Sequence, residues 1–310
     1  MALLVWIIIF SAVGGVLSVL VASVFLLLPA AFRARLLPAM VSFAIGALLG
    51  AAFLALLPHA LEAPGVDGAH RIMAAVLLGV LLFFILEKLV LWRHCHTHEC
   101  DVHGSTSVAG GTSAGMREVE QRREQLPRMP GATDVHGSTG VAGGRMPGAT
   151  ETHAPASGHG HTSAAGHLIL LGDGIHNFVD GVLIAAAFLT DIHLGIITAI
   201  AVAAHEIPQE LGDFAILLDS GFTRRKALLY NVLSGLTTVV GAVLAYYSLG
   251  MAQAAVPYVL AIAASSFIYI AVADLIPGLH KRVEGAATLQ QGVLIGFGVA
   301  TIYTAHSLLH

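Results

Sequence analysis

Two apolar stretches of the chain carry acidic, amide and imidazole side chains at helical spacing. At about 100° per residue, residues 173–181 place four of these side chains on one helical face: Asp173, His176, Asn177 and Asp180. Residues 205–213 place five on a somewhat wider face: His205, Glu206, Gln209, Glu210 and Asp213. Nitrogen and oxygen ligands on two otherwise apolar helices would lower their burial cost by facing each other around a cation. We therefore expect a divalent metal ion between the two faces.

The charge of these stretches supports the same hypothesis. The apolar runs at residues 166–189 and 193–217 contain five acids but no Lys or Arg, so the histidines away from the ends of the runs, His176 and His205, are the only internal cations available. An ionised carboxylate inside a bilayer is costly unless a cation or a donor compensates it. A divalent ion offsets two negative charges directly. Protonated acids are the alternative, and a proton-coupled pathway is compatible with both.

The spacing also supplies ligand pairs within each helix. Two i,i+4 pairs meet on one face: His176 with Asp180, and His205 with Gln209. Asn177 and Glu206 lie one position further along, so a second, adjacent set of oxygen ligands is available. Imidazole and carboxylate ligands without thiolate favour Zn(II), Fe(II), Mn(II) or Cd(II) over Cu(I). Four glycines would let the helices approach closely: Gly172, Gly174, Gly181 and Gly212.

The helices that position these residues are predicted to cross a membrane. The chain is 56% hydrophobic and 11% charged, with a mean hydropathy of +0.81, which is too apolar for a soluble domain of 310 residues. Eight apolar runs predict membrane spans at residues 2–30, 38–58, 71–92, 166–189, 193–217, 226–249, 255–276 and 288–308. We expect an all-α integral membrane protein. The net charge of -4 provides no basic field for nucleic acid.

Lys and Arg predict how the spans are oriented. They gather on alternate connections, at residues 33–35, 93–145, 224–226 and 281–282. By the positive-inside rule, both termini face outward and the long connection between the third and fourth spans is cytoplasmic. A plasma membrane or inner membrane suits this orientation.

The chain divides into three parts at the long connection. Residues 1–92 hold three spans, residues 93–165 form a linker, and residues 166–310 hold five spans with the metal site. The linker contains no Phe, Trp, Tyr or Ile, so we expect it to be disordered. Its start is dense in ligands for borderline-soft metals, which predicts metal capture or, alternatively, a solvated tract: His94, Cys95, His96, His98 and Cys100.

The central motifs resemble those of the ZIP (Zrt- and Irt-like protein) family of metal transporters. They read His176-Asn177-x-x-Asp180-Gly181 and His205-Glu206-x-Pro208-x-Glu210. Leu-Pro-His59-Ala-Leu-Glu62 closing the second span, and Asp274 in the seventh, match as well. The resemblance implies eight helices in a 3+2+3 arrangement with inverted repeats, and a two-metal site in helices four and five. It assigns one metal position to four residues: His176, Asp180, His205 and Gln209. It assigns the neighbouring position to Asn177 and Glu206.

The chain departs from the family pattern at three places. Gln209 stands where this branch usually has His, and a neutral amide is a much poorer ligand. Family members add a carboxylate from the sixth helix, where this chain offers only Ser234, Thr237 and Thr238. Ala51 replaces an acid often present on the second helix. We therefore expect an altered first position and a second position that lacks one ligand.

Further polar residues predict a path to the site. His59 and Glu62 lie at the predicted outer mouth, and three acids lie within the central spans: Asp173, Glu210 and Asp213. Glu87 and Asp274 lie close to predicted cytoplasmic ends, where a local ion pair or snorkelling accounts for them. His306 and His310 are interpreted as incidental.

These observations predict transport of a divalent transition metal, with zinc the leading candidate and iron, manganese and cadmium the alternatives. The resemblance to the ZIP family implies that the metal moves into the cytoplasm. An inside-negative potential favours a dication's inward movement by about 4.6 kcal/mol per 100 mV, so no nucleotide motor is needed. We expect a transporter and not an enzyme, with metal ion and bilayer as partners, no organic cofactor and no nucleic acid; a homodimer stays open.

Two other functions remain as alternatives. His176-x-x-x-Asp180 also suits a metal exporter of the cation-diffusion type, although such proteins typically have six spans and a soluble C-terminal domain. His205-Glu206-x-x-Gln209 approaches the His-Glu-x-x-His motif of an intramembrane metalloprotease, but it lacks the second His.

Overall fold

The computed structural model describes residues 2–63, 68–95, 162–280 and 285–309, which are helical with short connections. The helices of the first half are α1 (Ala2–Ala12), η1 (Val13–Leu17), α2 (Ser18–Phe25), α3 (Ala30–Gly50), η2 (Ala51–Leu56), α4 (Leu57–Glu62) and α5 (Ala69–Cys95). Those of the second half are α7 (Thr162–Thr190), α8 (Ile192–Asp219), α9 (Arg224–Met251), η3 (Gln253–Ala255), α10 (Val256–Tyr269), η4 (Ile270–Leu275), α11 (Ile276–Leu279) and α12 (Gly285–Leu309). η1, η2 and η4 are π-helical and η3 is a 3₁₀ turn.

Eight helical stretches within the described ranges are long and apolar enough to cross a bilayer. They span Ala2–Phe25, Ala30–Glu62, Ala69–Lys88, Gly166–Thr190, Ile192–Asp219, Arg224–Met251, Gln253–Leu279 and Gly285–Leu308. The predicted all-α class and all eight predicted spans are confirmed. The second span begins at residue 30 and not at residue 38, because the helix continues through Pro38 and includes Arg33 and Arg35. The predicted linker, residues 93–165, lies largely outside the described residues.

The two helices that carry the polar stretches, α7 and α8, form a tight hairpin. Only Asp191 separates Thr190 from Ile192, and it has an extended backbone. Its carboxylate accepts the backbone N–H groups of His193 and Leu194 at 2.8 and 3.2 Å, which caps α8. The hairpin therefore sets the register in which the polar faces of the two helices meet.

A second close packing joins α7 to α9. A Cβ on Gly181 would lie 1.9 Å from the Thr238 carbonyl oxygen, and one on Gly241 would lie 2.1 Å from the Phe178 carbonyl oxygen. Glycine at both positions lets the two backbones touch. The prediction of close approach is confirmed at Gly181, but it is wrong at Gly212, where an added Cβ would meet nothing within 4 Å.

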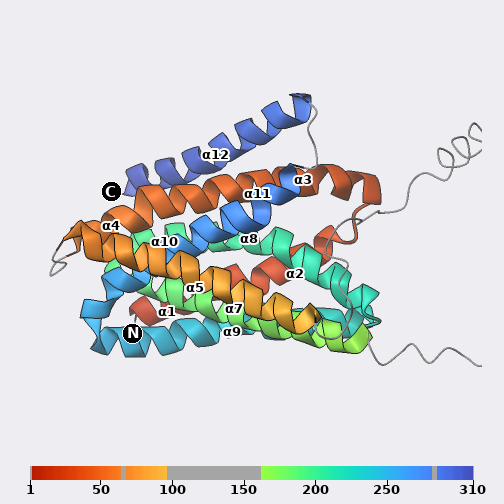
Figure 1. Ribbon diagram of the computed structural model, residues 1–310, viewed down its shortest axis with the longest axis horizontal. Helices are drawn as coiled ribbons and strands as arrows, with labels where there is room; N and C mark the ends of the chain where they lie inside the picture. Colours follow the sequence, from red (N-terminus) through yellow and green to blue (C-terminus); the bar gives the residue numbers. More distant parts are fainter. Residues whose placement is uncertain (1, 64–67, 96–161, 281–284, 310) are drawn as a thin grey trace, which may run out of the picture. The chain divides into compact units, whose positions relative to one another are not determined.

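The second and seventh spans change their helical hydrogen bonding at matching places. In each, a π-helical segment is followed directly by a proline near the start of the next helix: η2 by Pro58, and η4 by Pro277. Around them α3 packs against α12, and α5 packs against α10 (Figure 1). A π-helical segment followed by a proline therefore occurs in both predicted three-helix halves. It agrees with the inverted repeat, which stays a prediction.

Small side chains fill the core beside the central hairpin. The main apolar cluster includes Ala51, Ala52 and Ala55 of η2 together with Ala263 and Ala264 of α10, all with zero exposure. Alanines let helices approach closely in a bilayer. Ala51, where the family often has an acid, is thus a packing residue in this chain.

Candidate metal centre

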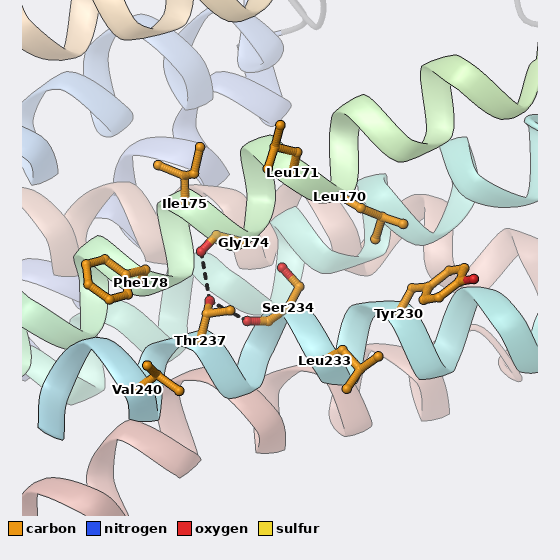
Figure 2. A pocket seen from close by; sticks show the side chains of 10 residues that line it. All are labelled: Leu170, Leu171, Gly174, Ile175, Phe178, Tyr230, Leu233, Ser234, Thr237 and Val240. Atoms are coloured by element: carbon orange, nitrogen blue, oxygen red, sulfur yellow. Dashed lines mark hydrogen bonds between the residues drawn. The ribbon is translucent and has the colours of Figure 1, made fainter. Parts of the chain in front are cut away.

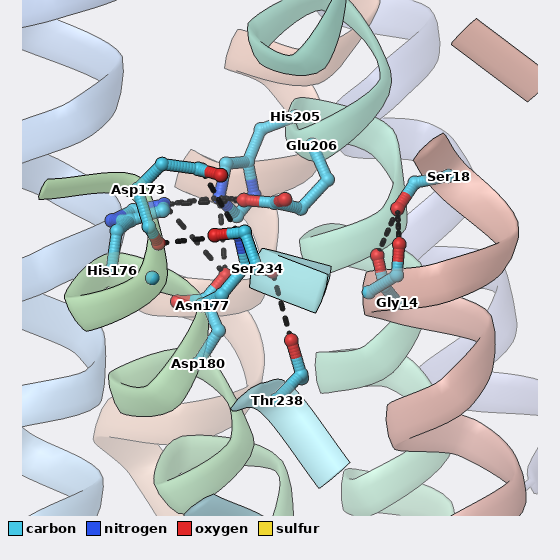
Figure 3. A network of polar contacts seen from close by, with 12 residues as sticks. Gly14, Ser18, Asp173, His176, Asn177, Asp180, His205, Glu206, Ser234 and Thr238 are labelled. Atoms are coloured by element: carbon cyan, nitrogen blue, oxygen red, sulfur yellow. Dashed lines mark hydrogen bonds and ion pairs between the residues drawn. The ribbon is translucent and has the colours of Figure 1, made fainter. Parts of the chain in front are cut away.

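Four side chains of the α7–α8 hairpin converge on one buried point. His176 and Asp180 come from α7, and His205 and Glu206 come from α8 (Figure 3). One ligand atom from each lies within 4.8 Å of the others. Asp180, His205 and Glu206 have zero side-chain exposure, while His176 keeps 21%. The site is thus inside the protein but open along the edge of His176.

Five of the six distances between these four atoms are close to the edges of a tetrahedron around a small cation. His176 Nε2 lies 3.3 Å from His205 Nε2 and 3.2 Å from Glu206 Oε1. Asp180 Oδ2 lies 3.2 Å from His205 Nε2 and 3.9 Å from His176 Nε2. His205 Nε2 lies 3.5 Å from Glu206 Oε1. Ligands bonded to tetrahedral zinc at about 2.0–2.1 Å stand roughly 3.3 Å apart, so this set suits Zn(II) with little rearrangement.

The hydrogen bonding of His205 leaves its Nε2 atom available for a metal. Nδ1 lies 3.1 Å from the Ala201 carbonyl oxygen, which can only accept, so Nδ1 carries the proton. In the neutral ring Nε2 then presents a lone pair, which is the orientation that backbone carbonyls give to metal-binding histidines. The buried carboxylates of Asp180 and Glu206 lie against the two imidazoles: Glu206 Oε1 is 3.2 Å from His176 Nε2, and Asp180 Oδ2 is 3.2 Å from His205 Nε2. When both rings are neutral and carry their proton on Nδ1, lone pairs face one another, and a cation between them would relieve their repulsion.

A second group lies directly beside the first. Ligand oxygens of Asp173, Glu206 and Glu210 also lie within 4.8 Å of one another. Glu206 belongs to both groups. Asp173 and Glu210, predicted as path residues, are therefore buried beside the candidate centre, with exposures of 5% and 0%.

A cavity of about 450 Å³ reaches the centre from one side. Its lining includes Asp173 and His176 of the centre together with Asp213 and Asp274. It extends to Glu87, near the end of α5. On the opposite side the neighbouring residues are apolar and fully buried: Leu183, Ile184, Ala201, Val202 and Phe267. The centre is thus accessible from the side where α5 ends and α7 begins, and it is sealed on the other.

A different groove of about 530 Å³ runs between α7 and α9. Figure 2 shows that apolar side chains line most of it, and that the Thr237 hydroxyl donates to the Gly174 carbonyl oxygen at 2.8 Å. This groove offers no charged ligand, so it is not an ion site. The bond ties α9 to the helix that carries the ligands.

Comparison with known protein families identifies the family to which this chain belongs. The family model described as ZIP Zinc transporter matches residues 1–305. The chain belongs to the ZIP family. The eight spans of the described residues and the family match together establish a multi-pass membrane protein.

Several curated ZIP proteins are similar to this chain. It is 31% identical over 301 residues to the zinc transporter ZIP13 homolog of Drosophila melanogaster, covering 86% of this chain and 76% of that protein. It is 33% identical over 261 residues to zinc transporter ZIP4 of Rattus norvegicus, covering 77% of this chain and 37% of that protein. It is 40% identical over 140 residues to the zinc transporter foi of Drosophila melanogaster, covering 44% of this chain and 20% of that protein. The chain thus spans well under half the length of the latter two.

The ZIP resemblance assigned Gln209 and Asn177 as ligands, and the structure gives both other surroundings. Gln209 is half-buried and lines the cavity beside His176, while Glu206 takes the fourth corner of the tetrahedral set. Asn177 is fully buried and uses its amide on neighbouring side chains: its Nδ2 donates to Asp173, and its Oδ1 accepts from Thr238. Their ligand roles stay predictions.

The remaining predicted residues lie apart from the ZIP centre. His59 and Glu62 are in α4, and neither lines the cavity. The ring of His306, interpreted as incidental, lies 5.7 Å from that of His59 between centroids, so the two histidines form a pair. His96, His98 and Cys100 lie outside the described residues. His94 and Cys95 are described only as the helical backbone that ends α5.

Sequence reasoning missed the grouping of acids at the cavity mouth. Asp274 and Glu87 were interpreted by a local ion pair or by snorkelling, and the structure adds that both line the cavity that reaches the candidate centre. Glu87 accepts a hydrogen bond from the Tyr269 hydroxyl of α10. Their positions in the sequence could have revealed this grouping. Glu87 lies near the end of the third predicted span and Asp274 near the end of the seventh, and both of these ends are predicted to face the same side of the membrane.

Proposed function

We propose that this ZIP family member carries a divalent transition metal across a membrane, with zinc the foremost substrate, through the site between α7 and α8. The observation that carries the proposal is the tetrahedral set of His176, Asp180, His205 and Glu206. Two imidazoles and two carboxylates at these spacings suit Zn(II), and Fe(II), Mn(II) or Cd(II) also accept such ligands. The curated relatives named as zinc transporters support the same substrate.

The inward direction of transport is the one that the resemblance to the ZIP family implies, and the predicted orientation of the spans is compatible with it. We place the termini outside and the long connection in the cytoplasm, as the positive-inside rule predicts, in a plasma or inner membrane. The cavity then opens toward the cytoplasm, and the structure corresponds to a state from which metal is released inward. An inside-negative potential assists inward movement of a dication by about 4.6 kcal/mol per 100 mV.

Transport by this geometry requires alternating access. The sealed side, formed around Leu183, Val202 and Phe267, must open while the cavity lined by Asp213 and Asp274 closes. The π-helical segments η2 and η4 lie in the spans flanking the hairpin, and π-segments are sites where helices bend. We infer that motion of the two three-helix halves about the hairpin exchanges the two states.

Two observations disfavour the alternative functions. The family match and the eight spans differ from the six-span pattern of cation-diffusion exporters. A metalloprotease of the His-Glu-x-x-His type uses its Glu as a base on bound water, whereas Glu206 here lies within the ligand set and Gln209 replaces the second His. A transporter, not an enzyme, is the function that fits.

Zinc flux into proteoliposomes tests the proposal. The full chain, His176→Ala and the matched control His167→Ala, a histidine of the same helix outside the centre, are reconstituted with known sidedness. We expect zinc uptake by the full chain and by the control, and none by His176→Ala. Equal uptake by all three, or movement only in the export direction, would refute it.

A further inference from the structure

We propose that the groove between α7 and α9, together with a polar pocket at the start of α9, binds one anionic glycerophospholipid. The groove takes an acyl chain, and the pocket takes the phosphate beside Lys226. The inference goes beyond the proposed function and stands without it, except that the predicted orientation of the spans assigns the lipid to the cytoplasmic leaflet.

The surface of the groove suits a hydrocarbon chain. Exposed aliphatic side chains border it on both helices: Leu171, Ile175, Leu233 and Val240. Between them the Thr237 hydroxyl donates to the Gly174 carbonyl oxygen at 2.8 Å, so this polar pair is satisfied within the protein (Figure 2). A concave apolar surface on a membrane span offers its area to apolar atoms. The hydrocarbon of a lipid is therefore the ligand that this groove fits.

The length of the groove corresponds to one leaflet. Figure 2 shows Tyr230 at one end of the groove and Val240 at the other. The two residues are ten positions apart on α9, which at 1.5 Å per residue is about 15 Å. The hydrocarbon core of a bilayer is about 30 Å thick. The groove thus covers about half of that thickness, which is the depth that one acyl chain occupies.

Tyr230 joins the groove to the polar pocket, because it lines both. The pocket has a volume of about 240 Å³, and its lining includes Ser220, Thr223 and Lys226. The ring of Tyr230 packs against that of Phe222 at 5.7 Å between centroids. Tyrosine is enriched at membrane interfaces, where its ring is apolar and its hydroxyl is polar. The groove and the pocket therefore meet where acyl chains join headgroups.

The charge around the pocket favours an anion. Arg224, Arg225 and Lys226 follow one another at the start of α9, and all three are exposed. Asp219 is the single acid nearby in the chain, so residues 219–226 carry three positive charges and one negative charge, a net charge of +2. A lysine ammonium binds phosphate as a point charge. Each Lys or Arg near an anionic membrane surface strengthens binding roughly fivefold.

Native mass spectrometry of the purified full chain in detergent tests the headgroup. Dioleoyl phosphatidylglycerol, dioleoyl phosphatidylcholine and glycerol phosphate are titrated separately. We expect one phosphatidylglycerol per chain, held at least about fivefold more tightly than phosphatidylcholine, and no retained glycerol phosphate. Lys226→Ala should weaken phosphatidylglycerol about fivefold. The control Arg35→Ala removes an exposed cation of α3 that lines neither the groove nor the pocket, and it should bind as the wild type does.

Val240→Phe tests the acyl chain separately. The larger ring fills the end of the groove away from the pocket, so the variant should bind dioleoyl phosphatidylglycerol more weakly than the wild type. It should bind the short-chain dioctanoyl form equally well, because that chain ends before residue 240. Leu244→Phe is the control, since Leu244 is exposed one turn further along α9 and does not line the groove.

Three results would each overturn the inference. Equal retention of the two dioleoyl lipids, or wild-type affinity in Lys226→Ala, would show that the pocket does not select an anionic headgroup. Glycerol phosphate held as tightly as the lipid would identify a site for free phosphate. Equal affinities of Val240→Phe and Leu244→Phe for the dioleoyl lipid would show that no acyl chain occupies the groove. Lys226→Gln repeats the headgroup test should Lys226→Ala not fold.

Discussion

His205 Nε2 lies 3.2 Å from Asp180 Oδ2, and in the neutral ring neither atom carries a hydrogen to place between them. The proton of His205 is on Nδ1, which donates to the Ala201 carbonyl oxygen. Two acceptors at this distance repel each other. A cation bound to both atoms would remove this repulsion, which is the role that the proposed function gives to the metal.

The tetrahedral set predicts that Asp180 matters more to zinc than Gln209. Asp180→Ala removes one of the four proposed ligands. Since the loss of a residue that only supports a ligand already lowers metal affinity about 10–100-fold, zinc affinity should fall at least about tenfold. Gln209→Ala should change it much less, because Glu206 already provides the fourth corner. Isothermal titration of zinc into both variants measures this. A larger loss in Gln209→Ala would restore the amide to the ligand set.

Zinc affinity should depend on pH in one direction. Imidazole ordinarily gains a proton near pH 6.5, and metal binding requires that His176 and His205 shed it. Protons therefore compete with zinc, and affinity should fall progressively as the pH is lowered from 8 to 5. Competition titrations between pH 5 and pH 8 follow this. An affinity that is constant over that range would exclude the two histidines as ligands.

Thr238 should act on metal binding through Asn177. Thr238→Val keeps the shape of the side chain but removes the donor to the buried Asn177 amide, at a cost of about 1–3 kcal/mol in the free energy of unfolding. Thr237→Val is the control, since its hydroxyl donates to the Gly174 carbonyl oxygen instead.

Zinc affinity separates these two threonine variants. Both substitutions should lower the unfolding temperature, but only Thr238→Val should weaken zinc binding, because Asn177 contacts Asp173 beside the candidate centre. Equal zinc affinities would show that the amide does not position Asp173.

The contact of α7 with α9 predicts unequal effects of two glycine substitutions. An added Cβ at Gly181 would lie 1.9 Å from a backbone oxygen, so Gly181→Ala must push the helices apart and should destabilise the protein by about 1–3 kcal/mol. Gly212→Ala meets no atom within 4 Å, and should change stability by no more than about 0.5 kcal/mol. Thermal unfolding in detergent compares the two. Similar melting temperatures for both variants would mean that the helices do not pack this closely.

Helical periodicity predicted much of the centre, because the residues that converge are local in sequence. His176 and Asp180 are four positions apart, and a single-residue turn at Asp191 brings their face against that of His205. Apolar length likewise predicted the eight spans, since a bilayer sets the length that a helix needs.

Which side chains would gather in each of the two candidate groups was not predictable from the residue spacing. Glu206 joins both groups because of how α7 and α8 pack, which residue spacing does not encode. The role of Asn177 depends on Thr238, 61 residues away on another helix. Gly212 and Gly181 look alike in the sequence, but an added Cβ would meet a backbone oxygen at Gly181 and nothing within 4 Å at Gly212. Such features depend on tertiary contacts.

Crystals of the full chain soaked in zinc, with diffraction recorded at the zinc absorption edge, test the central claim most directly. We predict an anomalous peak at about 2.0–2.2 Å from His176, Asp180, His205 and Glu206. Peaks found only elsewhere, with these four side chains paired to other groups, would contradict it.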